Sequence, residues 1–85
     1  LLDRPSAQRR WQQDWSAAYA HFCEQLALAE RFGQPAPWLD PYAAQAPAEF
    51  FACACEAYWV ARERFALEFP ALAALLDAFF RRPPR

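Results

Sequence analysis

Two glutamates interrupt an otherwise apolar segment of the chain, and they are its most informative candidates for chemistry. Glu49 and Glu56 lie within residues 48–60, which are otherwise rich in Ala, Phe and Cys. They are separated by about two helical turns, so on a helix they fall near the same face. An ionised carboxylate on a buried helix costs several kcal/mol unless it is paired or bound to a metal ion. The pattern therefore indicates that these acids need a counter-charge.

A second explanation, without chemistry, fits the same residues. Glu49 lies in the first turn of this predicted helix, where the helix dipole favours an acid whose head group stays in water. Glu56 could form an ion pair with Arg62 or with an arginine outside this chain. The sequence pattern alone leaves both explanations open.

The other metal-binding side chains form no recognisable motif. His21 is the only histidine, in the middle of a predicted helix, where packing or surface exposure is the commoner role. Cys53 and Cys55 are two residues apart, so on a helix they point to nearly opposite sides and cannot chelate one ion. The C-x₂₋₄-C spacing typical of zinc sites is absent. We expect the cysteines to act as small buried hydrophobic residues.

Three helices are expected to position these residues. Ser6 is a favoured residue type for a helix N-cap. From about residue 6 to 32, apolar residues recur every three or four positions, which predicts an amphipathic helix. Gly33, the only glycine, is expected at its C-terminal end. A proline-rich loop, residues 33–46, follows.

The second half of the chain is also predicted to be helical. Pro47 suits the first turn of a helix over residues 47–60. Because that segment is apolar nearly all round, we expect a buried helix. Residues 62–64 indicate a polar break or a short helical turn, and Pro70 opens a last helix over residues 70–82. No strand pattern or internal repeat occurs, so the predicted fold class is all-α.

The composition limits the class of protein. Eighty-five residues make one domain at most, with a core that is marginal without a disulfide, a metal or a partner surface. Yet 56% of the residues are hydrophobic and 18% aromatic, which predicts an unusually aromatic core or a face that packs on something else. The chain begins at Leu1 and contains no methionine, so we expect it to be the C-terminal piece of a larger protein.

Charge and cysteine content exclude several functions. The net charge is −1, without the basic surface of a nucleic-acid binder. The one cationic cluster, Arg81, Arg82 and Arg85, is expected to be a solvated tail that favours a helix C-terminus. No apolar run approaches the ~20 residues of a membrane span. Three cysteines, an odd number, argue against a disulfide framework and favour a reducing, cytoplasmic compartment.

Several blocks of the sequence resemble a known family. Asp-Pro-Tyr-Ala-Ala at 40–44, Pro-Ala-Glu-Phe-Phe-Ala at 47–52 and then Glu56 resemble the C-terminal part of the Mlc titration factor A family, also called the DgsA anti-repressor family. The resemblance continues through residues 70–81 and, more weakly, back to about Trp11. It covers most of this chain, but only the C-terminal portion of the family's domain.

The resemblance implies a zinc-dependent peptidase of the gluzincin type, acting on a peptide substrate. In that family an H-E-x-x-H helix provides two histidine ligands and the general base, and a glutamate on a later helix is the third zinc ligand. Glu49 matches that glutamate. The segment is also similar to the catalytic domain of anthrax lethal factor, which has a tyrosine seven residues before its zinc-binding glutamate. By that resemblance Tyr42 would donate a hydrogen bond to the developing oxyanion. Glu56 would accept one from a ligand histidine or an arginine.

One departure from the family is large, because this chain contains no H-E-x-x-H. We therefore expect residues 1–85 to be a C-terminal helical subdomain of a larger peptidase domain, inactive and poor at binding zinc by itself. The apolar helix would then have an uncovered face, and we expect self-association through it if this is the whole chain. The alternative is a non-catalytic interaction module, since the resemblance also implies binding to Mlc, a repressor of glucose-uptake genes.

Overall fold

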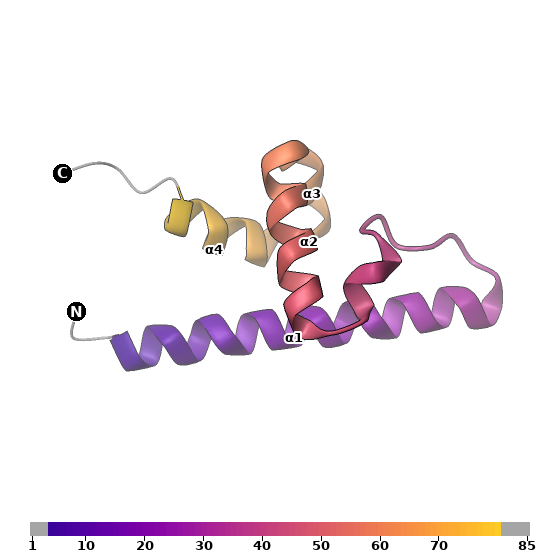
Figure 1. Cartoon of the computed structure of the whole chain (residues 1–85), viewed down its shortest axis with the longest axis horizontal. Helices are drawn as coiled ribbons and strands as arrows, with labels where there is room; N and C mark the ends of the chain where they lie inside the picture. The colour runs from indigo at the N-terminus through magenta and orange to yellow at the C-terminus, as the bar shows by residue number, and fades with distance from the viewer. Residues whose placement is uncertain (1–3, 81–85) are drawn as a thin grey trace.

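The chain folds into a small assembly of helices. The computed structural model describes residues 4–80. In chain order these residues form α1 (Arg4–Phe32), the 3₁₀ helix η1 (Pro41–Ala44), α2 (Pro47–Val60), α3 (Arg62–Glu68) and α4 (Pro70–Phe80) (Figure 1). No strand occurs between residues 4 and 80, which confirms the predicted all-α fold.

The long helix α1 is the base on which η1, α2 and α4 pack, whereas α3 packs on α2 and α4. Figure 1 shows α2 rising from the middle of α1, while α4 lies above the N-terminal half of α1. The helix begins at Arg4, so the N-cap predicted at Ser6 is wrong, and Ser6 is an exposed residue inside the helix. Pro5 is compatible with this earlier start because the first amides of a helix have no helical acceptor.

The C-terminal end of α1 is where the sequence predicts it. Gly33 adopts a left-handed conformation with φ of 68°, which a glycine reaches without steric cost. The N–H of Gln34 then donates to the carbonyl of Ala29 at 2.8 Å. This hydrogen bond closes the last turn of α1, and the helix ends there.

The proline-rich loop contains a short helix that its prolines did not reveal. The Asp40 side chain accepts a hydrogen bond from the backbone N–H of Tyr42 at 2.9 Å and so caps η1. Ala43 of η1 is fully buried. At the other end, the Tyr19 hydroxyl of α1 donates to the Ala44 carbonyl at 2.9 Å. These contacts fix η1 against α1.

The helix α2 has the predicted bounds, but it is buried on one side only. Phe50, Ala54 and Tyr58, spaced four residues apart, form its buried stripe. Trp59 and Val60 remain exposed. The expectation of a buried helix is therefore wrong for the described residues, because among residues 4–80 no element covers the second side of α2.

The polar segment after α2 begins a separate helix, α3, which is longer than the short helical turn that the sequence predicted as one alternative. Ala61 and Phe69 have non-helical backbone angles (φ −138°, ψ 63° and φ −135°, ψ 68°) and separate α3 from its neighbours. The last helix begins at Pro70, as predicted. Its predicted end at residue 82 and the arginines at 81, 82 and 85 lie outside the described residues.

Phe50 is the centre of an aromatic core. Its ring centroid lies 6.0 Å from that of Trp15, 5.6 Å from Tyr19 and 5.7 Å from Phe22, all on α1. The ring of Phe69, between α3 and α4, is 6.0 Å away. Aromatic pairs at such separations add to the free energy gained by burial alone. The remaining buried residues around this centre are Leu39, Ala43, Ala54, Tyr58, Phe65, Leu72, Ala73 and Leu76.

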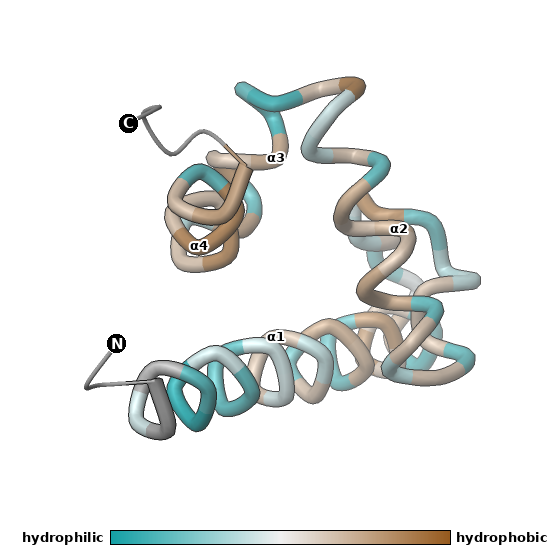
Figure 2. The backbone as a smooth tube through the Cα atoms, turned by 60° about the vertical axis from the view of Figure 1, so that its left-hand side comes forward, coloured by the Kyte–Doolittle hydropathy of each residue, from teal (hydrophilic) through white to brown (hydrophobic). Residues whose placement is uncertain are grey.

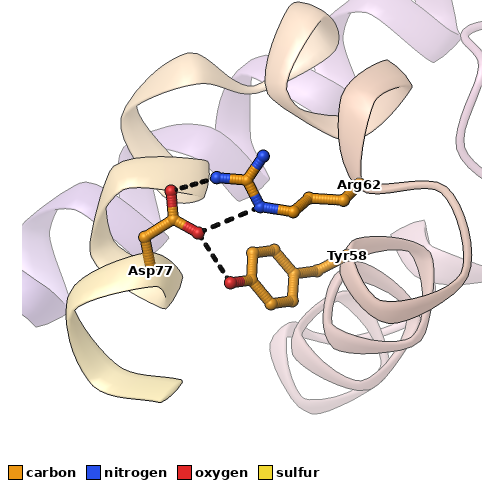
Figure 3. Close-up of polar contacts among 3 residues, drawn as sticks. All are labelled: Tyr58, Arg62 and Asp77. Atoms are coloured by element: carbon orange, nitrogen blue, oxygen red, sulfur yellow. Dashed lines mark hydrogen bonds and ion pairs between the residues drawn. The ribbon is translucent and has the colours of Figure 1, made fainter. Parts of the chain in front are cut away.

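One carboxylate, that of Asp77 in α4, connects three helices (Figure 3). The Tyr58 hydroxyl of α2 donates to Asp77 Oδ1 at 2.6 Å, and Arg62 Nε of α3 donates to the same oxygen at 3.2 Å. Arg62 Nη2 pairs with Oδ2. Hydrogen bonding to Asp77 raises the pKa of Arg62. Arg62 and Asp77 are partly exposed, so water weakens their attraction, whereas Tyr58 is only 1% exposed and its hydroxyl relies on Asp77.

Replacing Tyr58 by phenylalanine should lower the free energy of unfolding by about 1–3 kcal/mol, because a hydrogen bond to a charged acceptor is lost. The ring contacts with Trp59 and Phe65 should remain. Urea unfolding followed by circular dichroism measures the change. The matched control is Tyr42→Phe, which removes an exposed hydroxyl and should change stability by less than about 0.5 kcal/mol. Equal effects of the two substitutions would contradict this role of Asp77.

Candidate functional site

Glu49 lies in the first turn of α2, beside the buried stripe. The next residue, Phe50, is buried, and successive residues of a helix are rotated by about 100°, so the Glu49 side chain departs from the core. Glu49 is half-buried. Ala46, the N-cap of α2, provides no side-chain hydrogen bond to the backbone amides of the first turn. Because these amides and the helix dipole are positive, a nearby acid such as Glu49 is favourable. Within residues 4–80 the Glu49 carboxylate forms no hydrogen bond or ion pair.

Glu49, Cys53 and Glu56 share one side of α2, which we call the acidic flank. Their spacing of four and three residues places them on neighbouring turns. The pKa of the Cys53 thiol is raised, first by desolvation and then by the negative charges of Asp40, Glu49 and Glu56. A thiolate at Cys53 would therefore be repelled by all three carboxylates. This agrees with the predicted common face of Glu49 and Glu56.

The ion pair between Glu56 and Arg62, predicted as an alternative, does not form. Arg62 is bound to Asp77, which the turn at Ala61 brings within reach. Glu56 is exposed and borders a cavity that Asp40 and Cys53 also line. The acidic flank therefore has no cation from Arg62.

Tyr42 is carried by η1, which packs against α2. Its side chain is 55% exposed, while its backbone N–H is held by Asp40. The buried Ala43 and the Tyr19–Ala44 hydrogen bond fix the backbone on which Tyr42 stands. The phenol is thus accessible to another molecule, while the backbone that carries it is held in place.

Two contributors to this region escaped the sequence reasoning. Asp40 caps η1 and also adds negative charge beside Cys53. Asp77 was overlooked as the partner of Arg62. Asp77 is the single acid in the apolar segment Leu72–Phe80. An acid within an apolar segment is the same pattern that indicated Glu49.

The described part of the chain contains no complete metal site. No group of three or more His, Cys, Asp or Glu side chains between residues 4 and 80 could hold an ion. His21 is exposed on α1 and borders a different cavity, together with Glu68 and Pro37. The three cysteines are free and half-buried, so burial as small hydrophobic residues is only partial. Glu49 and Glu56 both have an accessible carboxylate without a partner among residues 4–80, as a zinc ion held by further protein groups would require.

No helix within residues 4–80 combines the length and the apolar character needed to cross a membrane.

These features belong to a known class of proteins. Residues 1–81 match the family described as glucose-regulated metallo-peptidase M90, so this chain belongs to that metallopeptidase family.

Similar proteins carry a more specific name. The chain is 38% identical over 74 residues to Mlc titration factor A of Salmonella typhi, and equally to that of Salmonella agona. The match covers 87% of this chain and 27% of each relative, so the chain spans about a quarter of the length of these relatives. The predicted resemblance to the Mlc titration factor A family is thereby confirmed. No solved structure matches the chain significantly, and the similarity to anthrax lethal factor stays a prediction.

Proposed function

We propose that this chain is the C-terminal helical subdomain of a zinc-dependent metallopeptidase, in which Glu49 supplies one zinc ligand. The observation that carries the proposal is the unpaired Glu49 carboxylate in a segment that matches a metallopeptidase family. The two histidine ligands and the general base would come from an H-E-x-x-H helix outside residues 1–85. When bound, zinc lowers the pKa of a water molecule to about 7 and polarises the scissile carbonyl.

The residues of this chain would hold and orient the reacting groups. The buried Phe50 keeps the first turn of α2 in place, and with it the Glu49 carboxylate. Tyr42 would donate its hydroxyl hydrogen to the oxygen of the peptide carbonyl as negative charge develops there. Its exposure and its fixed backbone suit this role. Glu56 would accept a hydrogen bond from a ligand histidine or an arginine, which would orient that group.

Glu49→Ala and Tyr42→Phe should separate metal binding from turnover in the complete protein. Glu49→Ala should reduce bound zinc by more than about tenfold and abolish peptidase activity. Tyr42→Phe should leave zinc in place and lower kcat by about 10²–10³, the usual effect of losing one donor to an oxyanion. Zinc content is measured by atomic absorption and turnover with a peptide substrate.

Glu24→Ala is the control, since Glu24 is an exposed acid on α1. It should change neither zinc content nor turnover. Normal zinc content and activity in Glu49→Ala would refute the ligand assignment. Loss of zinc in Tyr42→Phe would give Tyr42 a structural role instead.

A second function is supported by the name of the relatives, Mlc titration factor A, which indicates binding to Mlc. The chain could serve as a non-catalytic interaction module for an Mlc-type repressor. Exposed aromatic side chains provide apolar surface for such a contact.

Binding of Mlc should survive Glu49→Ala if the contact is independent of the metal site. A pull-down of purified Mlc with the wild-type and Glu49→Ala proteins measures this. Equal capture supports an interaction surface separate from the acidic flank. Loss of capture in Glu49→Ala, with the fold intact by circular dichroism, would show that the contact depends on the site.

The uncovered side of α2 continues into a surface that we call the aromatic strip. Trp59 is 62% exposed and its ring lies 5.1 Å from Phe80, which lies 4.9 Å from Phe79. Phe79 is 60% exposed and lies 5.6 Å from Trp11 of α1. Figure 2 shows brown, hydrophobic backbone over most of α2 and α4. In a complete peptidase domain this strip would pack on the remaining part.

The isolated 85-residue chain should self-associate through the aromatic strip. Sedimentation velocity should detect dimers or larger species, and Trp59→Glu should shift the chain toward monomer. The control Leu67→Glu introduces the same charge on α3, where Leu67 is 79% exposed and outside the strip. Its oligomeric state should equal that of the wild type. A wild-type chain that is monomeric throughout would overturn this expectation.

A further inference from the structure

A cavity of about 300 Å³ opens beside the acidic flank of α2. One wall comes from the segment before η1 and the other from the C-terminal half of α2. The lining residues are Trp38, Leu39, Asp40, Cys53, Glu56, Ala57, Val60 and Ala61. The cavity therefore lies one helical turn beyond Glu49, the ligand assigned above. A peptide bound at Glu49 could place a neighbouring side chain there.

The lining of this cavity carries two carboxylates and no cation. Asp40 accepts one hydrogen bond, from the backbone N–H of Tyr42. Glu56 has no hydrogen bond or ion pair within residues 4–80. Desolvation is the main cause of the raised pKa of the Cys53 thiol, and the same two carboxylates, together with Glu49, raise it further. Negative charge is thus concentrated at the cavity and is not neutralised by its own lining.

The arginines of the adjoining helix α3 are engaged with other acids. Arg62 is bound to Asp77. Arg64 is bound to Glu68 at 2.8 Å, and its guanidinium carbon lies 5.3 Å from the centre of the Trp38 ring. That contact occupies one face of the Trp38 ring with the chain's own guanidinium group.

The shape and lining favour an organic cation over a metal ion. Asp40, Cys53 and Glu56 line the cavity, but no three His, Cys, Asp or Glu side chains among residues 4–80 are placed to hold one metal ion. Trp38, Ala57 and Val60 provide apolar wall beside the carboxylates. A lysine or arginine side chain combines an aliphatic stem with a charged end, which is the pattern that this lining complements.

We propose that this cavity binds a lysine or arginine side chain of the peptide substrate, paired with Asp40 and Glu56. The aliphatic stem would lie on Ala57 and Val60. Acidic side chains would be repelled by the same carboxylates. The proposal rests on the proposed peptidase function. It makes a cationic side chain of the substrate, and not a ligand histidine, the partner of Glu56.

Peptide binding to the metal-free protein tests the cavity separately from catalysis. Isothermal titration calorimetry of the complete protein in EDTA would compare acetyl-Ala-Lys-Ala-amide with its norleucine and glutamate analogues. The lysine peptide should bind about 5–10-fold more tightly than the norleucine peptide, as expected for a partly solvated ion pair with two carboxylates. This preference should decrease as salt is added.

Glu56→Gln and Asp40→Asn should each reduce the preference to about twofold or less, and Asp40→Asn keeps an oxygen that can accept from the Tyr42 amide. The control Glu24→Gln makes the same charge change on α1 and should keep the preference. Equal affinities for the lysine and norleucine peptides, the absence of binding, or a preference that survives both substitutions would overturn the inference. An equal loss of the lysine preference in Glu24→Gln would show that the preference comes from the net charge of the protein and not from the cavity.

The outcome is distinguishable from failure of the peptidase proposal. Zinc content of the Glu49→Ala protein judges the metal site, and peptide preference without metal judges the cavity. Zinc affinity of Glu56→Gln adds a further distinction. The zinc affinity should be unchanged if Glu56 binds the substrate. A loss of about tenfold or more would show that Glu56 instead orients a ligand histidine.

Discussion

The burial of Phe50 is the contact on which the rest of this structure depends. Its ring contacts three aromatic residues of α1 and also Phe69, which lies between α3 and α4. Once Phe50 faces the core, helix geometry places Ala54 and Tyr58 on the same stripe. The same geometry leaves the acidic flank beside the core, because each residue of a helix is rotated by about 100° from the last. Packing at one phenylalanine thus orients the carboxylate assigned to the metal.

Two polar contacts hold the elements that the aromatic core does not constrain. The Tyr19 hydroxyl fixes the end of η1 on α1, and the Tyr58 hydroxyl fixes α4 on α2 through Asp77. In each case a tyrosine ring that is in contact with the core reaches a polar partner nearer to the surface. Aromatic residues with a polar end are suited to this arrangement, since the ring is buried while the hydroxyl keeps a hydrogen bond. A small domain with a modest core gains definition from such contacts.

The uneven burial of α2 fits the place of this chain in its family. The chain matches about a quarter of the length of its Mlc titration factor A relatives. An aromatic core and an exposed aromatic strip occur together, so the high apolar content serves two surfaces at once. The acidic flank and Trp59 of the strip both lie outside the buried stripe of α2. A covering layer over that side would therefore contact the candidate ligand and the apolar surface in one interface.

The sequence by itself determined the helical class, the bounds of α2 and the end of α1, because these follow from local rules. Hydrophobic spacing, a proline in a first turn and a single glycine act within a few residues. It also determined the family, through the runs around Tyr42 and Glu49. Only the tertiary structure decided which side of α2 is buried, that Arg62 pairs with Asp77 instead of Glu56, and that Asp40 joins the acidic flank. Those outcomes depend on where distant helices meet, and contacts between Phe50 and α1 or between Arg62 and α4 leave no periodic trace in the sequence.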